Sequence, residues 1–300
     1  MSELEQCSPA VARQRKPGDT CIPPDALQRL KRVWNKEHPE DPIMVGVGRK
    51  GTRKNGPSLW GSLRHAMMKH YNCNTEYCLV EKMPGLSKED RNNLEAFFRP
   101  KKPEEWLGKP TTWLDSFNIE DVMNQYESAY PHFEFIGPVP IDFDASDKFG
   151  KCIVEELCRL DLAKMSAAGT TQIGIIFNLD KHDEPGSHWV CGFVDIPKSS
   201  AYYFDSYGYE PPEEVVALMA KLRTQGITNT YYNDIRHQYK GSECGMYCLY
   251  TVISLILGKS FYNVCKRIVD DDTMNSLRDI LFASAKPRKE AGKARKLLEV

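Results

Sequence analysis

The strongest constraint on the fold is a nearly uninterrupted apolar stretch, "CGMYCLYTVISLILG", that runs from Cys244 to Gly258. A helix that is apolar on every face is normally buried, because it has no polar side to turn toward water. The stretch is shorter than the roughly 18 to 20 apolar residues that a helix needs to cross a bilayer. We therefore expect a central buried helix in a soluble protein, with no membrane partner.

This apolar helix begins with a cysteine, which is preceded by only a serine and a glutamate, Ser242 and Glu243. Most intracellular cysteines serve as small core residues, and Cys244 could be one of them. Alternatively, a helix N-terminus stabilises a thiolate and directs free backbone N–H groups at whatever the sulfur attacks. The rest of the chain has to decide between these two interpretations.

The composition is that of a globular protein, with 41% hydrophobic and 27% charged residues in a chain of 300. This length suits one large domain or two modest ones. Ten cysteines are too sparse for a small disulfide framework, so we expect most of them to be reduced. The first residues, "MSELEQCSPAVARQRKPG", lack the apolar block of a signal peptide, and we expect an intracellular protein that is not secreted.

Charge is distributed unevenly, with 20 basic and 14 acidic residues in 1–110 (+6) and 20 basic against 27 acidic in 111–300 (−7). A solvated surface accounts for the basic half better than an acidic partner does. The segment 286–296 has six basic residues in eleven, which gives only weak support for nucleic-acid contact.

One group of residues approaches a metal-binding pattern. It consists of His65, His70, Cys73 and Cys78. The two histidines would lie about 140° apart around a helix and so would not share a face. We therefore expect no metal site, and no cofactor for the chemistry.

The sequence pattern divides the chain into two parts. Residues 1–20 are polar and expected to be disordered, and helical spacing follows in three segments, 24–34, 58–71 and 86–98. From Pro110 short β-rich runs alternate with helices, which predicts an α+β fold whose sheet is covered by helices, preceded by a small helical domain. The expected strands are 133–137, 172–178, 188–196, 201–205 and 228–237, and the expected helices are about 117–128, about 150–165, 212–225, the segment from Cys244, and 271–282.

Four residues fall at the ends of expected strands or at the start of the apolar helix. His188 opens one strand, Asp205 ends the next, Gln238 follows a later strand, and Cys244 starts the apolar helix. A cysteine nucleophile needs a base to hold it as thiolate, and His188 is suited to that task. Asp205 could fix the tautomer of the imidazole, and Gln238 could donate to an oxyanion beside the backbone N–H of Cys244. Each residue alone is more often structural; their combination points to nucleophilic catalysis.

The local sequences "GSHWVCGFVDI", "YYFDSYG" and "RHQYKGSECGMYCLY" carry a resemblance in the same order. The chain resembles the ubiquitin-like-protein protease and adenovirus protease superfamily of cysteine peptidases (clan CE) over about residues 110–285. "FDSYGYEPP", "IRHQYKGSECG" and "RIVDDDTMNSLRDILF" are most similar to the polyprotein proteases of nucleocytoplasmic large DNA viruses, the African swine fever virus protease being the familiar member. The N-terminal half is similar to the corresponding region of predicted giant-virus proteases.

The resemblance implies a papain-like α+β catalytic domain with a central mixed sheet and the order His, Asp, Cys. It makes His188 the base, Asp205 its orienter, Gln238 the oxyanion donor and Cys244 the nucleophile. Asn178 stands where relatives place an asparagine ten residues before the histidine.

Relatives also hold a Gly-Gly tail in a tunnel between two tryptophans. Trp189 matches the first tryptophan, whereas alignment with the "WLND" motif puts Phe117 at the second tryptophan and Glu120 at the aspartate. Trp113 lies four residues before Phe117 and could be a core residue instead. Aromatic walls this close would favour glycine at the two positions before the cut.

The resemblance thus implies a thiol endopeptidase that cleaves after Gly-Gly in viral structural polyproteins, in the host cytoplasm (viral factory) and the virion. Its expected partners are a polyprotein with Gly-Gly-X sites and a capsid or core protein. The expected organisation is a disordered 1–20, a helical accessory domain 21–110, a catalytic domain 111–285 and a basic tail 286–300. Three alternatives stay open: a SUMO or ubiquitin-like deconjugating protease, a noncatalytic packaging or scaffold protein, and an acetyltransferase that uses the same triad.

Overall fold

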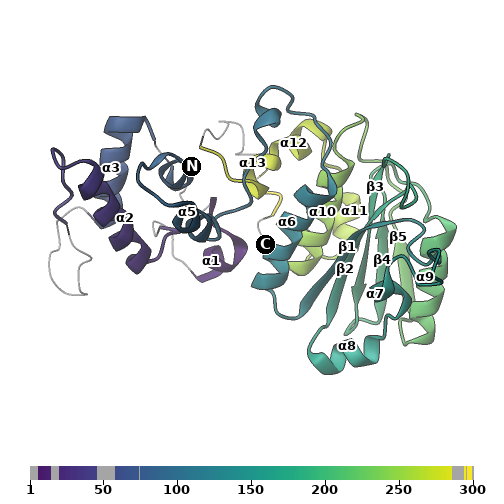
Figure 1. Cartoon of the computed structure of the whole chain (residues 1–300). Coiled ribbons are helices and arrows are strands. Elements are labelled where there is room, and N and C mark those ends of the chain that lie inside the picture. Colours follow the sequence, from purple (N-terminus) through teal and green to yellow (C-terminus); the bar gives the residue numbers. More distant parts are fainter. Residues whose placement is uncertain are drawn as a thin grey trace. The chain divides into compact units, whose positions relative to one another are not determined.

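The computed structural model describes residues 6–14, 20–45, 58–73, 75–285, 294 and 296–298. The chain divides into two compact units, one formed by residues 1–102 with 279–289 and the other by 103–278 with 290–300 (Figure 1). In these described ranges, no helix combines the length and the apolar character that crossing a membrane requires. The expected basic tail, 286–300, lies almost wholly outside the described residues.

The first unit is helical, as its sequence predicts. Hydroxyl side chains cap three of its helices, because Ser58, Thr75 and Ser87 each accept a backbone N–H from the first turn that follows. Trp34 is fully buried and belongs to the unit's hydrophobic core. The helices are α1 (Pro9–Gln14), α2 (Pro24–Glu37), α3 (Leu59–Tyr71), α4 (Glu76–Lys82) and α5 (Lys88–Glu95). Of these, α1 and α4 were not expected.

The N-terminal stretch differs from the expectation of disorder wherever the structure describes it. Residues 9–14 form α1, and a disulfide joins Cys7 to Cys21, both of which are completely buried. Residues 1–5 and 15–19 lie outside the described part.

The expectation of mostly reduced cysteines is also wrong, because three pairs are bridged. They are Cys7–Cys21, Cys73–Cys78 and Cys152–Cys158. Folding brings each pair of Cα atoms to between 5.3 and 6.5 Å, a proximity that spacing along the chain does not reveal.

The second unit is built on a five-stranded mixed sheet whose strand order follows the sequence. The outer pairs β1/β2 and β4/β5 are parallel, and the two central pairs are antiparallel. Every residue of the central strand β3 is buried. The strands are β1 (Phe133–Pro140), β2 (Gln172–Asn178), β3 (Trp189–Asp195), β4 (Ser200–Phe204) and β5 (Asn229–Tyr232). This architecture confirms the α+β class.

Helices cover both faces of the sheet. The apolar helix α10 (Cys244–Ile256) packs on β2 and β3, and α6 (Ser116–Ala129) packs on β1 and α10. Gly174 in β2 permits this approach, since a Cβ there would lie 2.9 Å from a methyl carbon of Val252 in α10. The other face packs against α7 (Glu155–Cys158), α8 (Leu162–Ala168) and α9 (Glu213–Thr224), as Figure 1 shows.

Several expected elements of this unit are shorter than predicted. The segment 150–165 forms two short helices, because Asp161 caps a new helix, α8, soon after α7 ends. The expected strand 228–237 ends at Tyr232, where Asn233 turns the chain by accepting the N–H of Ile235. The C-terminal segment divides into α12 (Asp271–Ser276) and α13 (Arg278–Leu281). Two elements were not expected, η2 (Glu104–Leu107) and α11 (Phe261–Lys266).

Candidate active site

The fold brings His188 and Asp205 together at one end of the sheet. His188 immediately precedes β3 and Asp205 immediately follows its antiparallel neighbour β4. Nε2 of the imidazole lies 2.8 Å from Oδ1 of the carboxylate. The backbone N–H of Tyr207 donates to the same oxygen at 2.8 Å, and Asp205 is only 1% exposed. The carboxylate is therefore held in one orientation toward the histidine.

Contacts with neighbouring groups determine the protonation of His188. Burial alone would lower its pKa, but hydrogen bonds with Asp205 and Cys244 outweigh that effect and raise the pKa to about 9. With Nε2 turned to Asp205, Nδ1 is the nitrogen left for the sulfur. Tyr207 stacks on the imidazole with ring centroids 4.8 Å apart and restrains the ring plane. At neutral pH the site accordingly favours an imidazolium beside the sulfur, and such a neighbour stabilises a thiolate.

Gln238 has a fixed amide. Its side chain is fully buried, Oε1 accepts the hydroxyl of Ser206 at 2.7 Å, and Nε2 donates to the carbonyl of Lys240 at 2.6 Å. Because an amide nitrogen carries two hydrogens, one N–H remains for another acceptor. The backbone N–H of Gln238 also bonds Ser206, the residue after Asp205.

Cys244 is the first residue of α10 and is 3% exposed. The N-cap residue, Glu243, does not cap the helix with its side chain. The first N–H groups of a helix have no intrahelical partner, and they carry the positive end of the helix dipole. The sulfur therefore stands beside groups that can stabilise an oxyanion.

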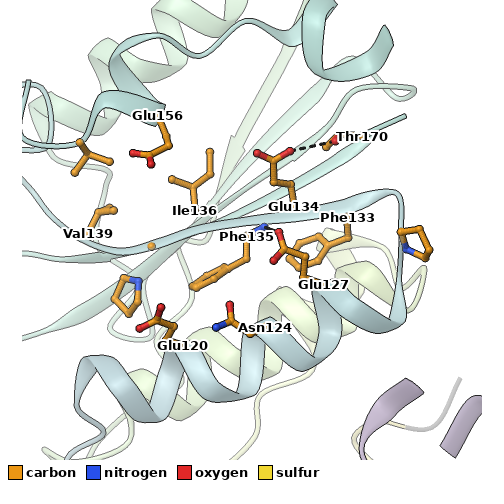
Figure 2. Close-up of a pocket in the computed structure, with 14 residues that line it drawn as sticks. Glu120, Asn124, Glu127, Phe133, Glu134, Phe135, Ile136, Val139, Glu156 and Thr170 are labelled. Atoms are coloured by element: carbon orange, nitrogen blue, oxygen red, sulfur yellow. Dashed lines mark hydrogen bonds between the residues drawn. The ribbon is translucent and has the colours of Figure 1, made fainter. Parts of the chain in front are cut away.

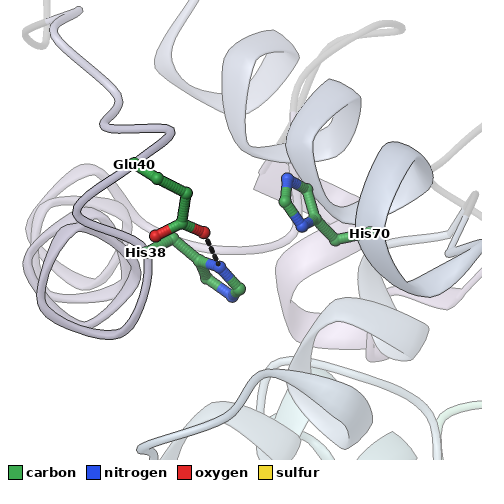
Figure 3. Close-up of side chains that lie close together, drawn as sticks. All are labelled: His38, Glu40 and His70. Carbon is green, nitrogen blue, oxygen red and sulfur yellow. Dashed lines mark hydrogen bonds and ion pairs between the residues drawn. The ribbon is translucent and has the colours of Figure 1, made fainter.

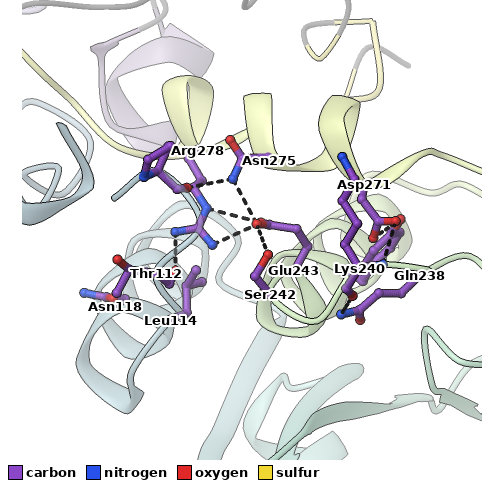
Figure 4. Close-up of polar contacts among 12 residues, drawn as sticks. Thr112, Leu114, Asn118, Gln238, Lys240, Ser242, Glu243, Asp271, Asn275 and Arg278 are labelled. Atoms are coloured by element: carbon purple, nitrogen blue, oxygen red, sulfur yellow. Dashed lines mark hydrogen bonds and ion pairs between the residues drawn. The ribbon is translucent and has the colours of Figure 1, made fainter. Parts of the chain in front are cut away.

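A buried polar network holds the residue before the cysteine, as Figure 4 shows. Arg278 donates to Oε2 of Glu243 from Nε at 3.2 Å and from a terminal nitrogen at 3.0 Å. The amide of Asn275 donates to Oε1 at 2.9 Å. Arg278 also donates to the carbonyl of Thr112 at 2.7 Å and lies over the ring of Trp106. These links tie the nucleophile turn to two other segments of the unit.

Sequence reasoning did not assign a role to this network, because its members lie far apart along the chain. The available signals were weak: a glutamate directly before an apolar helix, and an arginine within a C-terminal helical pattern. Ser206 and Tyr207 were equally missed as neighbours of the candidate site.

Trp189 packs tightly against the start of α10. Its indole N–H donates to the carbonyl of Leu114 at 3.0 Å. A Cβ on Gly245 would lie 3.1 Å from Leu114 and 3.3 Å from the Trp189 ring, so only glycine fits there without displacement. The structure thus places Trp189 beside the candidate nucleophile.

The other residues expected to bind substrate lie differently. Phe117 is 74% exposed in the first turn of α6, and among the described residues no hydrogen bond or ring contact joins it to Trp189. Trp113 is 49% exposed, so it is not a core residue. Glu120 lines a separate cavity of about 670 Å³ between α6 and β1, together with Asn124 and Glu127 of the same helix (Figure 2).

Asn178 has a clear local role. Its Oδ1 accepts the backbone N–H groups of Asp180 and Ser187, at 3.1 and 3.3 Å. It also lies opposite Trp189 in the β2/β3 register. The side chain therefore closes the loop that leads into His188.

Comparison with known proteins agrees with this geometry. The sequence model of the Ulp1 protease family, C-terminal catalytic domain, matches residues 171–290, which include all four candidate residues. The chain is 34% identical over 216 residues to a thiol protease of Acanthamoeba polyphaga mimivirus, covering 70% of this chain and 68% of that protein. It is 26% identical over 244 residues to a cysteine protease of African swine fever virus, covering 71% and 84%.

A solved structure extends the likeness to both units. The crystal structure of the African swine fever virus protease aligns with a TM-score of 0.62 at 21% identity, covering 94% of this chain and 97% of that one. That likeness shows a shared fold. Together with the identity to the mimivirus protein over two thirds of its length, it leads to one conclusion: the chain belongs to the Ulp1 protease family and is a cysteine protease.

Proposed function

We propose that this cysteine protease is an endopeptidase that cleaves after Gly-Gly in viral structural polyproteins, in the host cytoplasm and in the virion. The observation that carries the specificity is the burial of the sulfur. Cys244 is 3% exposed, beside a Trp189 ring that is 7% exposed. A substrate carbonyl has to reach this sulfur along a narrow approach, which favours residues without side chains. The viral origin of the relatives supports the biological setting.

The proposed chemistry begins with His188 and Cys244. The thiolate of Cys244 attacks the scissile carbonyl carbon, and the carbonyl electrons move to oxygen. The tetrahedral intermediate then collapses, the C–N bond breaks, and the His188 imidazolium gives its proton to the leaving amine. A thioester remains on the sulfur. Water, deprotonated by the now neutral His188, attacks it, and a carboxylate product leaves as the sulfur regains its resting state.

Asp205 and Gln238 support these steps. Asp205 accepts from Nε2 and keeps Nδ1 of His188 directed at the sulfur. Gln238 supplies its remaining amide hydrogen to the oxyanion, alongside the backbone N–H of Cys244. The bonds to Ser206 and Lys240 hold the amide in place before substrate arrives, so little reorganisation is needed.

For the substrate channel we propose Trp189 as one wall and an exposed aromatic residue near the start of α6 as the other. Phe117 is the expected residue, and Trp113 is an exposed neighbour of Leu114, whose carbonyl binds Trp189. Separate Phe117→Ala and Trp113→Ala variants decide between them. The variant that lacks the wall should accept alanine in place of glycine more readily than the wild type. We keep Asn178 as a support of this region, through the loop that it closes before His188. Glu120 stays a proposed substrate contact at the separate cavity between α6 and β1.

The test of specificity compares kcat/KM on Gly-Gly peptides, on peptides with either glycine changed to alanine, and on folded SUMO and ubiquitin precursors. Each alanine should cost at least about tenfold, equivalent to about 1.4 kcal/mol of transition-state binding. An African swine fever virus relative is named a SUMO-1 cysteine protease, so the deconjugase alternative is included in the comparison. A tenfold preference for a folded modifier would establish that alternative and overturn the polyprotein assignment.

A further inference from the structure

A cluster of metal-ligating side chains lies in the helical unit, outside the segment that matches the Ulp1 family. His38 follows the last residue of α2, Glu40 lies two residues later, and His70 is in the last turn of α3. One nitrogen from each imidazole and one carboxylate oxygen all lie within 4.8 Å of one another. Figure 3 shows the two rings and the carboxylate facing a common space.

A buried tryptophan supports both imidazoles. Trp34 stacks on His38 with ring centroids 4.1 Å apart and meets His70 edge-on at 5.3 Å. Its indole N–H donates to the carbonyl of Asp41 at 2.9 Å, which fixes the turn that carries Glu40. Because Trp34 is fully buried, the two rings rest on a rigid platform.

Each imidazole has a second partner on its far nitrogen. Nε2 of His38 lies 2.9 Å from the hydroxyl of Tyr71, and Nε2 of His70 lies 2.9 Å from Oδ2 of Asp41. A histidine that binds a metal usually donates its other N–H to such a group, and a carboxylate partner increases its basicity. Nδ1 of each ring is then the nitrogen available to a cation.

The local charge is also suitable. Nδ1 of His38 lies 3.0 Å from Oε1 of Glu40, a pair of acceptor atoms that needs either a proton or a cation between them. Two carboxylates, those of Glu40 and Asp41, lie beside the two rings, and the one nearby ammonium, that of Lys69, lies 2.7 Å from Oδ2 of Asp41.

We propose that His38, Glu40 and His70 bind one divalent transition-metal ion, with zinc as the best match. Two imidazoles and a carboxylate are common zinc ligands, and tetrahedral coordination at about 2.0–2.1 Å would draw the three atoms to about 3.3–3.5 Å from one another. The Glu40 side chain is 62% exposed, so the ion can enter and solvent supplies the fourth ligand. The ion joins the end of α2 to the end of α3 and stabilises the helical unit.

This site differs from the metal pattern considered in the sequence. There His70 was grouped with His65, Cys73 and Cys78. The two cysteines form a disulfide and offer no thiolate. The partners of His70 are instead His38 and Glu40, in the turn that follows α2, some thirty residues earlier in the chain.

The test is zinc binding by calorimetry to the full chain, after treatment with chelator and without reductant. A Cys244→Ala background removes the second place where zinc could bind, the catalytic thiol and imidazole. One zinc ion per chain should bind, and the Tm should rise with zinc concentration. Glu40→Gln and His70→Gln should each weaken binding at least tenfold, and Asp41→Asn should weaken it about 10- to 100-fold.

The matched control is His65→Ala, an exposed histidine on the same helix, which should leave the zinc affinity unchanged. Cobalt supplies a second readout, since a tetrahedral nitrogen and oxygen site gives visible bands without thiolate-to-metal charge transfer. Equal zinc affinity in His70→Gln and His65→Ala, a thiolate charge-transfer band, or absence of stoichiometric binding would each overturn the proposal.

Discussion

At the scale of single residues, the His188 imidazole links the two other members of the candidate triad. It hydrogen-bonds both Asp205 and Cys244, and those bonds raise its pKa to about 9 although burial opposes them. A proton that leaves only near pH 9 is available to a departing amine across the neutral range. The same shift governs how activity and stability depend on pH.

We predict that kcat/KM is sustained through neutral pH and falls as the pH rises through about 9, where His188 loses its proton. Asp205→Asn removes the anionic acceptor, so this alkaline limb should move to lower pH and kcat should drop. The raised pKa also contributes stability that is complete below about 6.5, the unperturbed pKa, and is lost as the pH approaches 9. A pH–rate profile of both proteins checks this, and an unchanged alkaline limb in Asp205→Asn would refute the coupling.

A second residue-scale prediction concerns Gln238. Gln238→Ala should lower kcat about 10²- to 10³-fold with a smaller change in KM, because a donor to the transition state is lost. Gln238→Glu should be at least as damaging, since a carboxylate would repel the oxyanion. Steady-state kinetics measures both. Full kcat in the two variants would make Gln238 a structural residue held by Ser206 and Lys240.

At the scale of elements, the start of α10 depends on the buried Glu243–Arg278 pair. Both side chains are 2% exposed. Removing one partner of a buried pair leaves an uncompensated charge, which costs about 3–5 kcal/mol. This loss of stability should mainly affect the turn that carries Cys244, because Glu243 directly precedes it.

We therefore predict that Glu243→Gln lowers the free energy of unfolding by about 3–5 kcal/mol and also reduces kcat. The matched control is Arg159→Met, which breaks an exposed pair with Glu155 and should cost no more than about 1 kcal/mol. Adding Arg278→Met to Glu243→Gln should recover part of the stability, because the unpaired charge is removed. Urea denaturation measures all three. Equal losses in Glu243→Gln and Arg159→Met would rule out this role for the pair.

Element prediction from sequence succeeded where local patterns decide the structure. Apolar runs located β2 and β3, and the residues at two strand ends and at the start of the apolar helix gave the order His188, Asp205, Cys244 that the fold brings to one place. It failed where a single capping residue interrupts a pattern, as Asp161 does between α7 and α8. Contacts such as Glu243 with Arg278 join residues 35 positions apart, and no local pattern reports them.

The substrate channel was the least predictable part of the site. Alignment by motif favours Phe117, and the contact that the structure gives Trp189 in this segment is the hydrogen bond from its indole N–H to the carbonyl of Leu114. A shift of a few residues before a helix start changes which aromatic side chain would line the channel that we propose. Only the position of the cap, here Asp115, fixes where α6 begins.

At the scale of the whole molecule, disulfides stabilise a protein whose cysteine spacing suggested reduced thiols. Two bridges lie in the helical unit and one in the sheet-containing unit. The four free cysteines of the described chain, Cys191, Cys244, Cys248 and Cys265, are all buried. Reducing conditions open the bridges and should therefore lower the free energy of unfolding, without acting directly on the candidate active site.

Loop length predicts the size of this effect. The Cys7–Cys21 bridge closes a span of 14 residues and should be worth about 3 kcal/mol, whereas Cys73–Cys78 closes 5 and should be worth about 2 kcal/mol. Thermal unfolding of the Cys7→Ser/Cys21→Ser and Cys73→Ser/Cys78→Ser variants checks the order. No loss of Tm in either variant, with intact-mass analysis showing both bridges in the wild type, would contradict it.

The central claim is that Cys244 is the nucleophile of a protease selective for Gly-Gly. Its most direct test is labelling with a peptide that ends in Gly-Gly and carries an electrophile at its C-terminus, followed by mass mapping of the modified residue. We predict a single adduct on Cys244, lost in Cys244→Ser, strongly slowed in His188→Ala, and retained in Cys248→Ala, whose cysteine lies one turn further along α10. An adduct on Cys191, Cys248 or Cys265, or equal labelling by an Ala-Ala peptide, would contradict the account.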